Sequence, residues 1–131
     1  SYIAVKKDLI GRIASCGGGE NPLQLLLLAN DLGGDKIDTL EKINIIKSWY
    51  RDVLLLMEMK NSASLFHPDC ADMTKEFSEK ITVRCILNSL KTVGSAYRVL
   101  ENNANKQLTL ESMMFKLAKL MQTQGMAALN E

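Results

Sequence analysis

The sequence predicts an all-α protein, built as a single bundle of five or six helices. Apolar residues recur at steps of three and four along most of the chain, which is the spacing of one helix face. Strict alternation of apolar and polar residues, the pattern of a half-buried strand, is nearly absent. The length of 131 residues suits one domain that buries a single core without help from disulfides or metal.

The first helix is expected at residues 2–15, and the second is expected to begin at the start signal of residues 21–24 and to end at Gly33-Gly34. The segment 21–24 reads Asn-Pro-Leu-Gln, a start signal in which Asn caps, Pro suits the first helical position and Gln reaches back. Gly33-Gly34 predicts the end of the second helix, because glycine commonly follows the last helical residue.

Residues 37–60 and 82–101 are expected to form the longest helices. The first is apolar on most of its circumference, which predicts a central position with neighbours on more than one side. In the second, Gly94 lies on the inner side. Either another helix approaches closely there, which would offset a helix-propensity cost of about 1 kcal/mol, or the glycine is a tolerated accident. We expect the apolar stripe of this helix to be largely buried at Val83, Ile86, Leu90, Val93 and Tyr97.

A short helix is expected after Pro68, and a last one from about Asn105 to Met121. Beyond Gly125 the chain is expected to fray. The sequence therefore predicts one helical domain over residues 1–125 and a tail over 126–131.

Composition argues against several classes of partner. The 16 Lys and Arg nearly cancel the 15 Asp and Glu, leaving a formal charge of +1. So small a charge predicts no direct binding to a nucleic-acid backbone and no binding to a membrane surface. No apolar run approaches the roughly 20 residues of a membrane span. The start lacks the charged-then-apolar pattern of a leader, so we expect no secretory signal. Because the sequence opens with Ser1 rather than Met, we expect it to be a piece of a longer protein.

The three cysteines, Cys16, Cys70 and Cys85, are odd in number and widely spaced. This is not the pattern of a secreted disulfide framework, so we expect a reducing, cytoplasmic location. His67 and Cys70 offer two metal ligands where a closed zinc site needs four, and we expect no metal.

Other signals of chemistry are weak, and we expect no catalytic residues and no cofactor. The glycines at 17–19 lack the strand, the Lys and the Ser or Thr of a phosphate-binding loop. The single histidine, His67, has no nucleophile signature beside it. His67-Pro68-Asp69 is the signature tripeptide of J-domain co-chaperones, but the residues before it are a polar break rather than a basic helix end. A helix start at Pro68 is the simpler interpretation.

Asp52 conflicts with its surroundings, because it falls in line with apolar residues of the 37–60 helix. Either Asp52 is buried and held by a cation or by hydrogen-bond donors, or it lies at the edge of the apolar arc and is partly exposed to solvent. Arg51 points roughly 100° away around the helix and is a poor partner for it.

Two segments carry a resemblance to a known family. Residues 46–54, with Trp49 and the pair Arg51-Asp52, resemble the long helix in the C-terminal domain of the delta-prime subunit of bacterial DNA polymerase III. Residues 103–111 resemble the Asn-rich turn and the start of the last helix in the same domain. Some relatives have Pro where this chain has Lys106. The motif residues in this chain are Trp49, Arg51, Asp52, Asn105, Leu108 and Glu111.

The resemblance implies a collar domain. In that family the helical bundle follows two AAA+ modules and packs with the matching domains of other clamp-loader subunits into a five-membered collar. The collar holds the loader together while the ATPase modules open the sliding clamp on primed DNA. The implied partners are the gamma or tau and delta subunits, and sister subunits have similar collars. The family's zinc module and arginine finger belong to its N-terminal part, so no such residue is assigned here.

Two other classes stay open beside the collar: a helical ligand-binding or regulatory domain and, least favoured, an enzyme. A cavity of a few hundred Å3 inside the bundle would favour the ligand-binding class. A filled core with apolar residues exposed on an outer face would favour assembly. For a collar we expect an isolated domain that is a monomer or weak dimer. We also expect partly exposed apolar residues on the flanks of the 37–60 and 105–121 helices.

Overall fold

The computed structural model describes residues 2–16, 21–59, 64–102 and 105–129, with side chains up to Gln124. Over these residues it contains six α-helices, one short 3-10 helix and no strand, which confirms the predicted all-α class. The elements are α1 (Tyr2–Ser15), α2 (Pro22–Leu32), α3 (Lys36–Met59), η1 (Pro68–Cys70), α4 (Ala71–Ser78), α5 (Val83–Glu101) and α6 (Lys106–Leu129). None of the described helices is long and apolar enough to cross a membrane. The expected loop at 17–19 lies outside the described residues.

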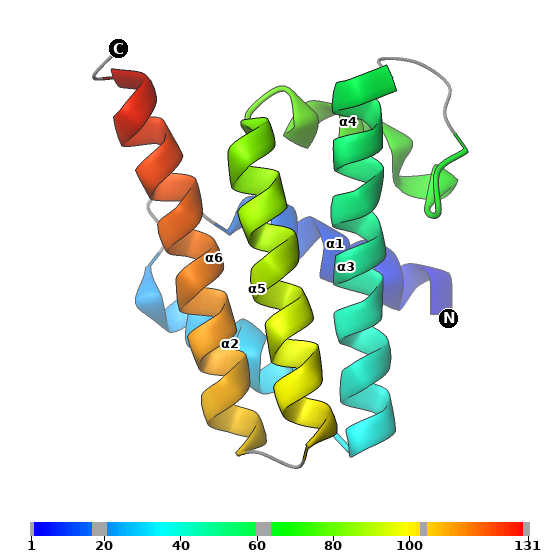
Figure 1. Ribbon diagram of the computed structural model, residues 1–131. Coiled ribbons are helices and arrows are strands. Elements are labelled where there is room, and N and C mark those ends of the chain that lie inside the picture. Colours follow the sequence, from blue (N-terminus) through cyan, green and yellow to red (C-terminus); the bar gives the residue numbers. More distant parts are fainter. Residues whose placement is uncertain (1, 17–20, 60–63, 103–104, 130–131) are drawn as a thin grey trace.

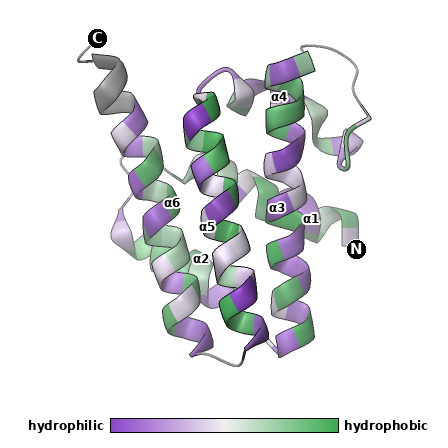
Figure 2. Ribbon diagram, in the orientation of Figure 1, coloured by the Kyte–Doolittle hydropathy of each residue, from purple (hydrophilic) through white to green (hydrophobic). Residues whose placement is uncertain are grey.

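Three long helices form one layer of the bundle. α3, α5 and α6 stand side by side with α5 in the middle, and consecutive members run in opposite directions (Figure 1). α1 and α2 cross behind this layer, where α1 packs mainly on α3 and α2 mainly on α6. Apolar and polar bands alternate along the helices, as expected where each helix has a buried and an exposed face (Figure 2).

The helix starts follow the sequence signals. The Asn21 side chain accepts a hydrogen bond from the backbone N–H of Leu23 at 2.9 Å, and Pro22 is the first residue of α2. The Thr82 side chain caps α5 by accepting from the N–H of Cys85 at 3.1 Å. α2 ends directly before Gly33, as predicted. Local side chains therefore supply partners that the first turns would otherwise lack.

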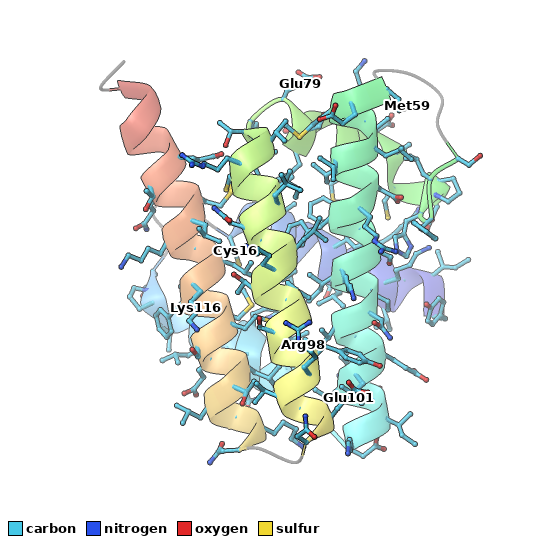
Figure 3. All side chains as sticks on the ribbon, in the orientation of Figure 1. Cys16, Met59, Glu79, Arg98, Glu101 and Lys116 are labelled. Atoms are coloured by element: carbon cyan, nitrogen blue, oxygen red, sulfur yellow. The ribbon has the colours of Figure 1, made fainter. Side chains whose placement is uncertain are left out.

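The core is centred on α3, as its apolar circumference predicted. Four of its apolar side chains are fully buried, namely Ile43, Ile46, Trp49 and Val53. Four more apolar side chains of α3 pack against the core while partly exposed, namely Leu40, Ile45, Leu54 and Met57. Side chains from both layers occupy the space between the ribbons (Figure 3). α3 is therefore the helix that the rest of the bundle surrounds.

Burial on α5 differs from the prediction. Ile86 and Val93 are fully buried, but Val83 is 39% exposed, and Leu90 and Tyr97 are only partly buried. The buried face is rotated toward Cys85, Ser89 and Ala96. The cause is that α5 packs against α3 on one side and α6 on the other, so its buried arc is wider than a single stripe and shifted from it.

Gly94 lies on the buried side of α5, as predicted. A Cβ built at this buried glycine would meet only the Arg98 guanidinium of the same helix, at 3.7 Å. No described neighbouring helix approaches closely enough to require glycine at this position. Among the two interpretations of Gly94, the structure supports tolerance rather than close packing.

The last helix is longer than predicted. α6 continues through Gly125 to Leu129 instead of ending near Met121, and so enters the stretch expected to be a tail. With 24 residues it equals α3 and exceeds the 19 residues of α5, so the longest pair is α3 and α6. A single glycine lowers helix propensity by only about 1 kcal/mol, which the flanking Gln, Met, Ala and Leu residues offset.

Candidate functional site

Asp52 ties the loop before η1 to the middle of α3. Its carboxylate is fully buried and accepts hydrogen bonds from the backbone N–H groups of Phe66 at 2.8 Å and His67 at 2.9 Å. Of the two interpretations left open by the sequence, the buried carboxylate held by donors is therefore correct. Arg51 is exposed, in agreement with its expected direction away from Asp52. Two charge-assisted bonds compensate a burial that would otherwise cost several kcal/mol.

Trp49 lies one turn before Asp52 and fixes α4 on α3. Its indole N–H donates to the Thr74 hydroxyl at 2.9 Å, and that hydroxyl donates to the carbonyl of Cys70 at 2.8 Å. The indole ring also packs on Phe77, with ring centroids 4.9 Å apart. Trp49 and Asp52 together hold both ends of the segment that carries His67 and Cys70.

His67 is buried beside a serine of α3. Its Nε2 lies 2.6 Å from the Ser48 hydroxyl, which in turn donates to the carbonyl of Ile45 at 3.1 Å. Burial lowers the pKa of His67, and the nearby Lys6 lowers it further. The ring is therefore neutral near pH 7, and Nε2–H donating to Ser48 satisfies both groups. Nδ1 is buried without a hydrogen-bond partner among the described atoms.

An ion pair between a buried lysine and an exposed aspartate completes this cluster. Lys6 of α1 is 8% exposed and reaches Asp69 of η1 at 2.8 Å. Their hydrogen bond raises the pKa of Lys6 and lowers that of Asp69. We call Lys6, Ser48, Asp52, His67 and Asp69 the polar junction. It joins α1, α3 and η1, so its polar groups serve chiefly to hold three elements together.

The arrangement gives little support for a metal or for catalysis. Within the described residues, no three His, Cys, Asp or Glu side chains gather in a way that could hold a metal ion. Burial raises the pKa of Cys70, which keeps it as a thiol. The Asp52 carboxylate binds backbone N–H groups rather than the His67 ring, so it does not orient the imidazole toward Ser48 as a catalytic triad would.

The second motif segment caps α6. The Asn105 side chain accepts from the N–H of Leu108 at 2.9 Å, and its carbonyl accepts from the hydroxyl of Thr109 at 2.7 Å. Lys106 donates to the carbonyl of Gly34, which links the start of α6 to the α2–α3 turn. Glu111 accepts from Gln107 of the same helix at 2.9 Å. These residues set where α6 begins, whereas Leu108 is 65% exposed and contributes nothing to the core.

Large apolar side chains remain exposed on several outer surfaces. The flanks predicted for the third and last helices do carry some, at Ile37, Met59, Leu108 and Phe115, with exposures of 41% to 72%. Others occur where none was expected. On α1 and the loop facing it they are Tyr2, Ile3, Val5 and Phe66, and on α2 they are Leu23, Leu26 and Leu27. The helical spacing of apolar residues did not predict the exposed residues of α2, because a nearly all-apolar helix does not reveal which side faces the solvent.

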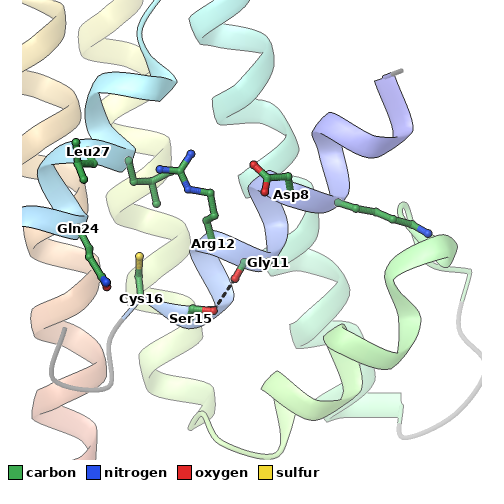
Figure 4. A pocket seen from close by; sticks show the side chains of 9 residues that line it. Asp8, Gly11, Arg12, Ser15, Cys16, Gln24 and Leu27 are labelled. Carbon is green, nitrogen blue, oxygen red and sulfur yellow. Dashed lines mark hydrogen bonds between the residues drawn. The ribbon is translucent and has the colours of Figure 1, made fainter. Parts of the chain in front are cut away.

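Hollows on the molecule are open surface grooves. One of about 540 Å3 lies between α1 and α2, with Cys16, Gln24 and Leu27 on its wall (Figure 4). A second, of about 530 Å3, lies beside the polar junction and exposes Tyr2 and Phe66. A third, of about 380 Å3, separates the outer faces of α5 and α6. They lie at the surface, around a core whose central side chains are fully buried.

A comparison with known families covers most of the chain. Residues 5–119 match the family described as "DNA polymerase III, delta subunit, C terminal". The chain belongs to this family. No curated protein sequence and no solved structure gives a significant match.

As a member, this chain is a domain of a clamp-loader subunit of DNA polymerase III, and it takes part in DNA replication. The matched range runs from the first turn of α1 to the middle of α6, so it contains the polar junction and the α6 cap. The family membership also argues against a J-domain, whose tripeptide here starts η1 as Pro68 predicted.

Proposed function

We propose that this clamp-loader domain is the collar domain of a delta-prime subunit. It would hold the AAA+ pentamer together while the sliding clamp is loaded for DNA replication. The observation that carries the proposal is the set of exposed large apolar side chains on the outer faces of α1, α2 and α6. Such residues on several sides of a filled core are typical of protein–protein contact surfaces.

The proposed partners are the gamma or tau and delta subunits, each contacting a different face. A heterologous ring contact does not require self-complementarity, so the isolated domain should be a monomer or a weak dimer. The formal charge of +1 favours neither direct nucleic-acid binding nor membrane binding. We propose a cytoplasmic location and no cofactor, as the cysteine pattern and the lack of a ligand-binding signature suggested.

The choice of delta-prime rests on the resemblance of residues 46–54 and 103–111, whereas the description of the matched family names the delta subunit. Trp49 and Asp52 lie in the segment that resembles the delta-prime long helix, and both have specific buried partners. Asn105 caps the helix that resembles the last helix of that domain. A functional replacement experiment separates the alternatives. The chain, placed on delta-prime AAA+ modules, should restore clamp loading, whereas on delta modules it should not.

A non-catalytic role is the simplest use of this domain. Ser48 and His67 form the one hydroxyl–imidazole pair among the described hydrogen bonds, and Ser48 is already engaged by the Ile45 carbonyl. A ligand-binding role is the alternative, and the grooves beside α1 are its best support. Both grooves are open to solvent. A site for a drug-sized ligand usually encloses most of the ligand's surface, so these open grooves favour the ligand-binding role less than a cavity would.

Co-elution tests the proposal. The chain is mixed at micromolar concentration with the gamma or tau subunit and with delta, and the mixtures are passed over a sizing column. We expect the chain to elute with at least one of them. An introduced charge, Leu27→Glu on α2, should weaken the contact, while Lys75→Gln serves as the control, because it makes the same one-unit change in charge at an exposed site on α4. Elution of the chain apart from every subunit would contradict the collar role.

A further inference from the structure

The groove between α5 and α6 differs from the other two grooves in the charge of its lining, since those include Asp8 and Glu41. It is about 380 Å3 in volume and is lined by five residues from each helix. They are Lys91, Thr92, Ser95, Ala96 and Val99 from α5, and Leu108, Thr109, Ser112, Met113 and Lys116 from α6. No acidic side chain is among them.

The lining residues form three successive layers. α5 and α6 are antiparallel neighbours separated in the sequence by residues 102–105, so residues equally far from that segment lie opposite each other. This places Val99 opposite Leu108, then Ser95 opposite Ser112, and finally Lys91 opposite Lys116. Each step is four residues, or about 6 Å along the helix, so the apolar and cationic layers are about 12 Å apart.

The floor of the groove is low because its residues are small or already satisfied. Ala96 and Met113 are buried beneath it. The hydroxyls of Thr92 and Thr109 donate to carbonyls one turn back in their own helices, at 2.9 Å and 2.7 Å. The two threonine hydroxyls therefore need no partner from outside the chain, and the floor of the groove carries no charged side chain.

The charged layer of the groove carries positive charge only, and it lies at one end. Lys91 and Lys116 are both exposed, and neither takes part in any of the ion pairs formed among the described residues. At the opposite end, Val99 is 42% exposed and Leu108 65%. Two unpaired cations at one end and two exposed apolar side chains at the other match a partner of complementary charge and polarity.

We propose that this groove docks an acidic amphipathic helix of a neighbouring clamp-loader subunit. An apolar side chain of that helix lies between Val99 and Leu108, and a carboxylate two turns away lies between Lys91 and Lys116. A small residue between them passes over Ser95. This proposal rests on the proposed assembly role and names the chemistry of one partner. Helix-in-groove contacts use this spacing of anchors.

A peptide titration followed by NMR tests the chemistry of the groove on its own. The probe is a 17-residue Ala- and Gln-based helical peptide with Leu, Ala and Glu at successive four-residue steps. The comparison peptide has Lys in place of Glu. The chain should bind the Glu peptide about fivefold more tightly, as expected for two exposed ion pairs, and the amide shifts should concentrate on the groove residues.

Charge reversal sharpens the test. The double variant Lys91→Glu/Lys116→Glu should prefer the Lys peptide. The matched variant Arg84→Glu/Lys119→Glu changes exposed cations of the same two helices outside the groove, and it should keep the original preference. Circular dichroism checks that both variants fold. Equal binding of the two peptides, or shifts concentrated elsewhere, would overturn the proposal.

Co-elution of the same variants separates this inference from the assembly role. If Lys91→Glu/Lys116→Glu loses a subunit that the matched variant retains, the groove is a subunit contact. If it retains every subunit that the unaltered chain binds, the groove proposal is overturned and the collar role stands. If the unaltered chain binds none, the collar role and the proposed partner fall together, whatever the peptides show.

Discussion

The polar junction and the α5–α6 groove both bring polar side chains from separate elements together, but they leave them in opposite states. In the junction, Asp52 is fully buried and each carboxylate oxygen has a backbone donor. In the groove, Lys91 and Lys116 are exposed and lack an ion-pair partner among the described residues. Within the junction, Asp52 and the Lys6–Asp69 pair have completed their contacts inside the chain, whereas the buried Nδ1 of His67 has no partner among the described atoms. The two lysines of the groove are exposed and have formed no such contacts among the described residues.

The difference indicates where to look for function. A buried polar group with no partner costs free energy, so a folded chain satisfies it internally, as Asp52 is satisfied. An exposed polar group is satisfied by water and can exchange that water for a partner protein. Changes in the junction should therefore act on stability, whereas changes in the groove should act on binding.

The largest effect on the free energy of unfolding is expected from the buried face of α5, which lies in the core. Ile86→Ala should lower the free energy of unfolding by about 2–5 kcal/mol, the usual cost of truncating a buried aliphatic side chain. Val83→Ala, three residues earlier at a 39% exposed position, should cost less than about 1 kcal/mol. Urea denaturation measures both. A loss below about 1 kcal/mol for Ile86→Ala would mean that the buried face of α5 is assigned wrongly.

The next effect breaks the junction itself. Asp52→Asn should cost about 1–3 kcal/mol, because an amide offers one acceptor oxygen to two buried donors. Arg51→Gln, at the adjacent exposed position, should stay within about 0.5 kcal/mol of the unaltered chain. The comparison uses the same denaturation assay. Equal losses for both variants would show that the Asp52 carboxylate does not hold the loop.

A smaller effect should appear in the pH dependence of stability. Burial lowers the pKa of His67 in the folded state below its ordinary value of 6.5. The unfolded chain therefore binds the proton first, so the contribution is fully present above about pH 6.5 and is lost as pH falls below it. His67→Gln should flatten the decline between pH 6.5 and 5 in thermal unfolding. An unchanged slope would place the titrating group elsewhere.

The smallest effect on stability is expected in the groove. Lys91→Glu/Lys116→Glu should change the free energy of unfolding by less than about 0.5 kcal/mol per site, because both side chains are exposed. The same variant should change partner binding. Denaturation and co-elution on one preparation measure both. A large loss of stability with unchanged binding would reverse the roles assigned to the two regions.

The sequence predicted the helices well because their signals are local. Asn21, Pro22 and Gly33 mark the ends of α2 through groups that lie within a few residues of one another. The error at Val83 has a different origin, since the width of the buried arc depends on how many helices pack around α5. Similarly, α6 extends past Gly125 because one glycine is too weak a signal to end a helix.

The site was only partly predictable. The sequence raised burial of Asp52 as one of two possibilities, but its partners are backbone groups at Phe66 and His67, which no side-chain pattern reveals. The groove depends on the register between α5 and α6, which places Val99 near Leu108 only after the helices have paired. Contacts between segments that are distant in the sequence therefore could not be predicted from local patterns.

Sedimentation of the isolated chain, alone and with other clamp-loader subunits, tests the central claim most directly. The account predicts a monomer or weak dimer at micromolar concentration that sediments faster when the gamma or tau subunit or delta is added. Faster sedimentation with the other subunits is expected because each exposed apolar face is proposed to bind a different subunit. A tight homodimer that buries well over about 2,000 Å2 and ignores the other subunits would contradict it.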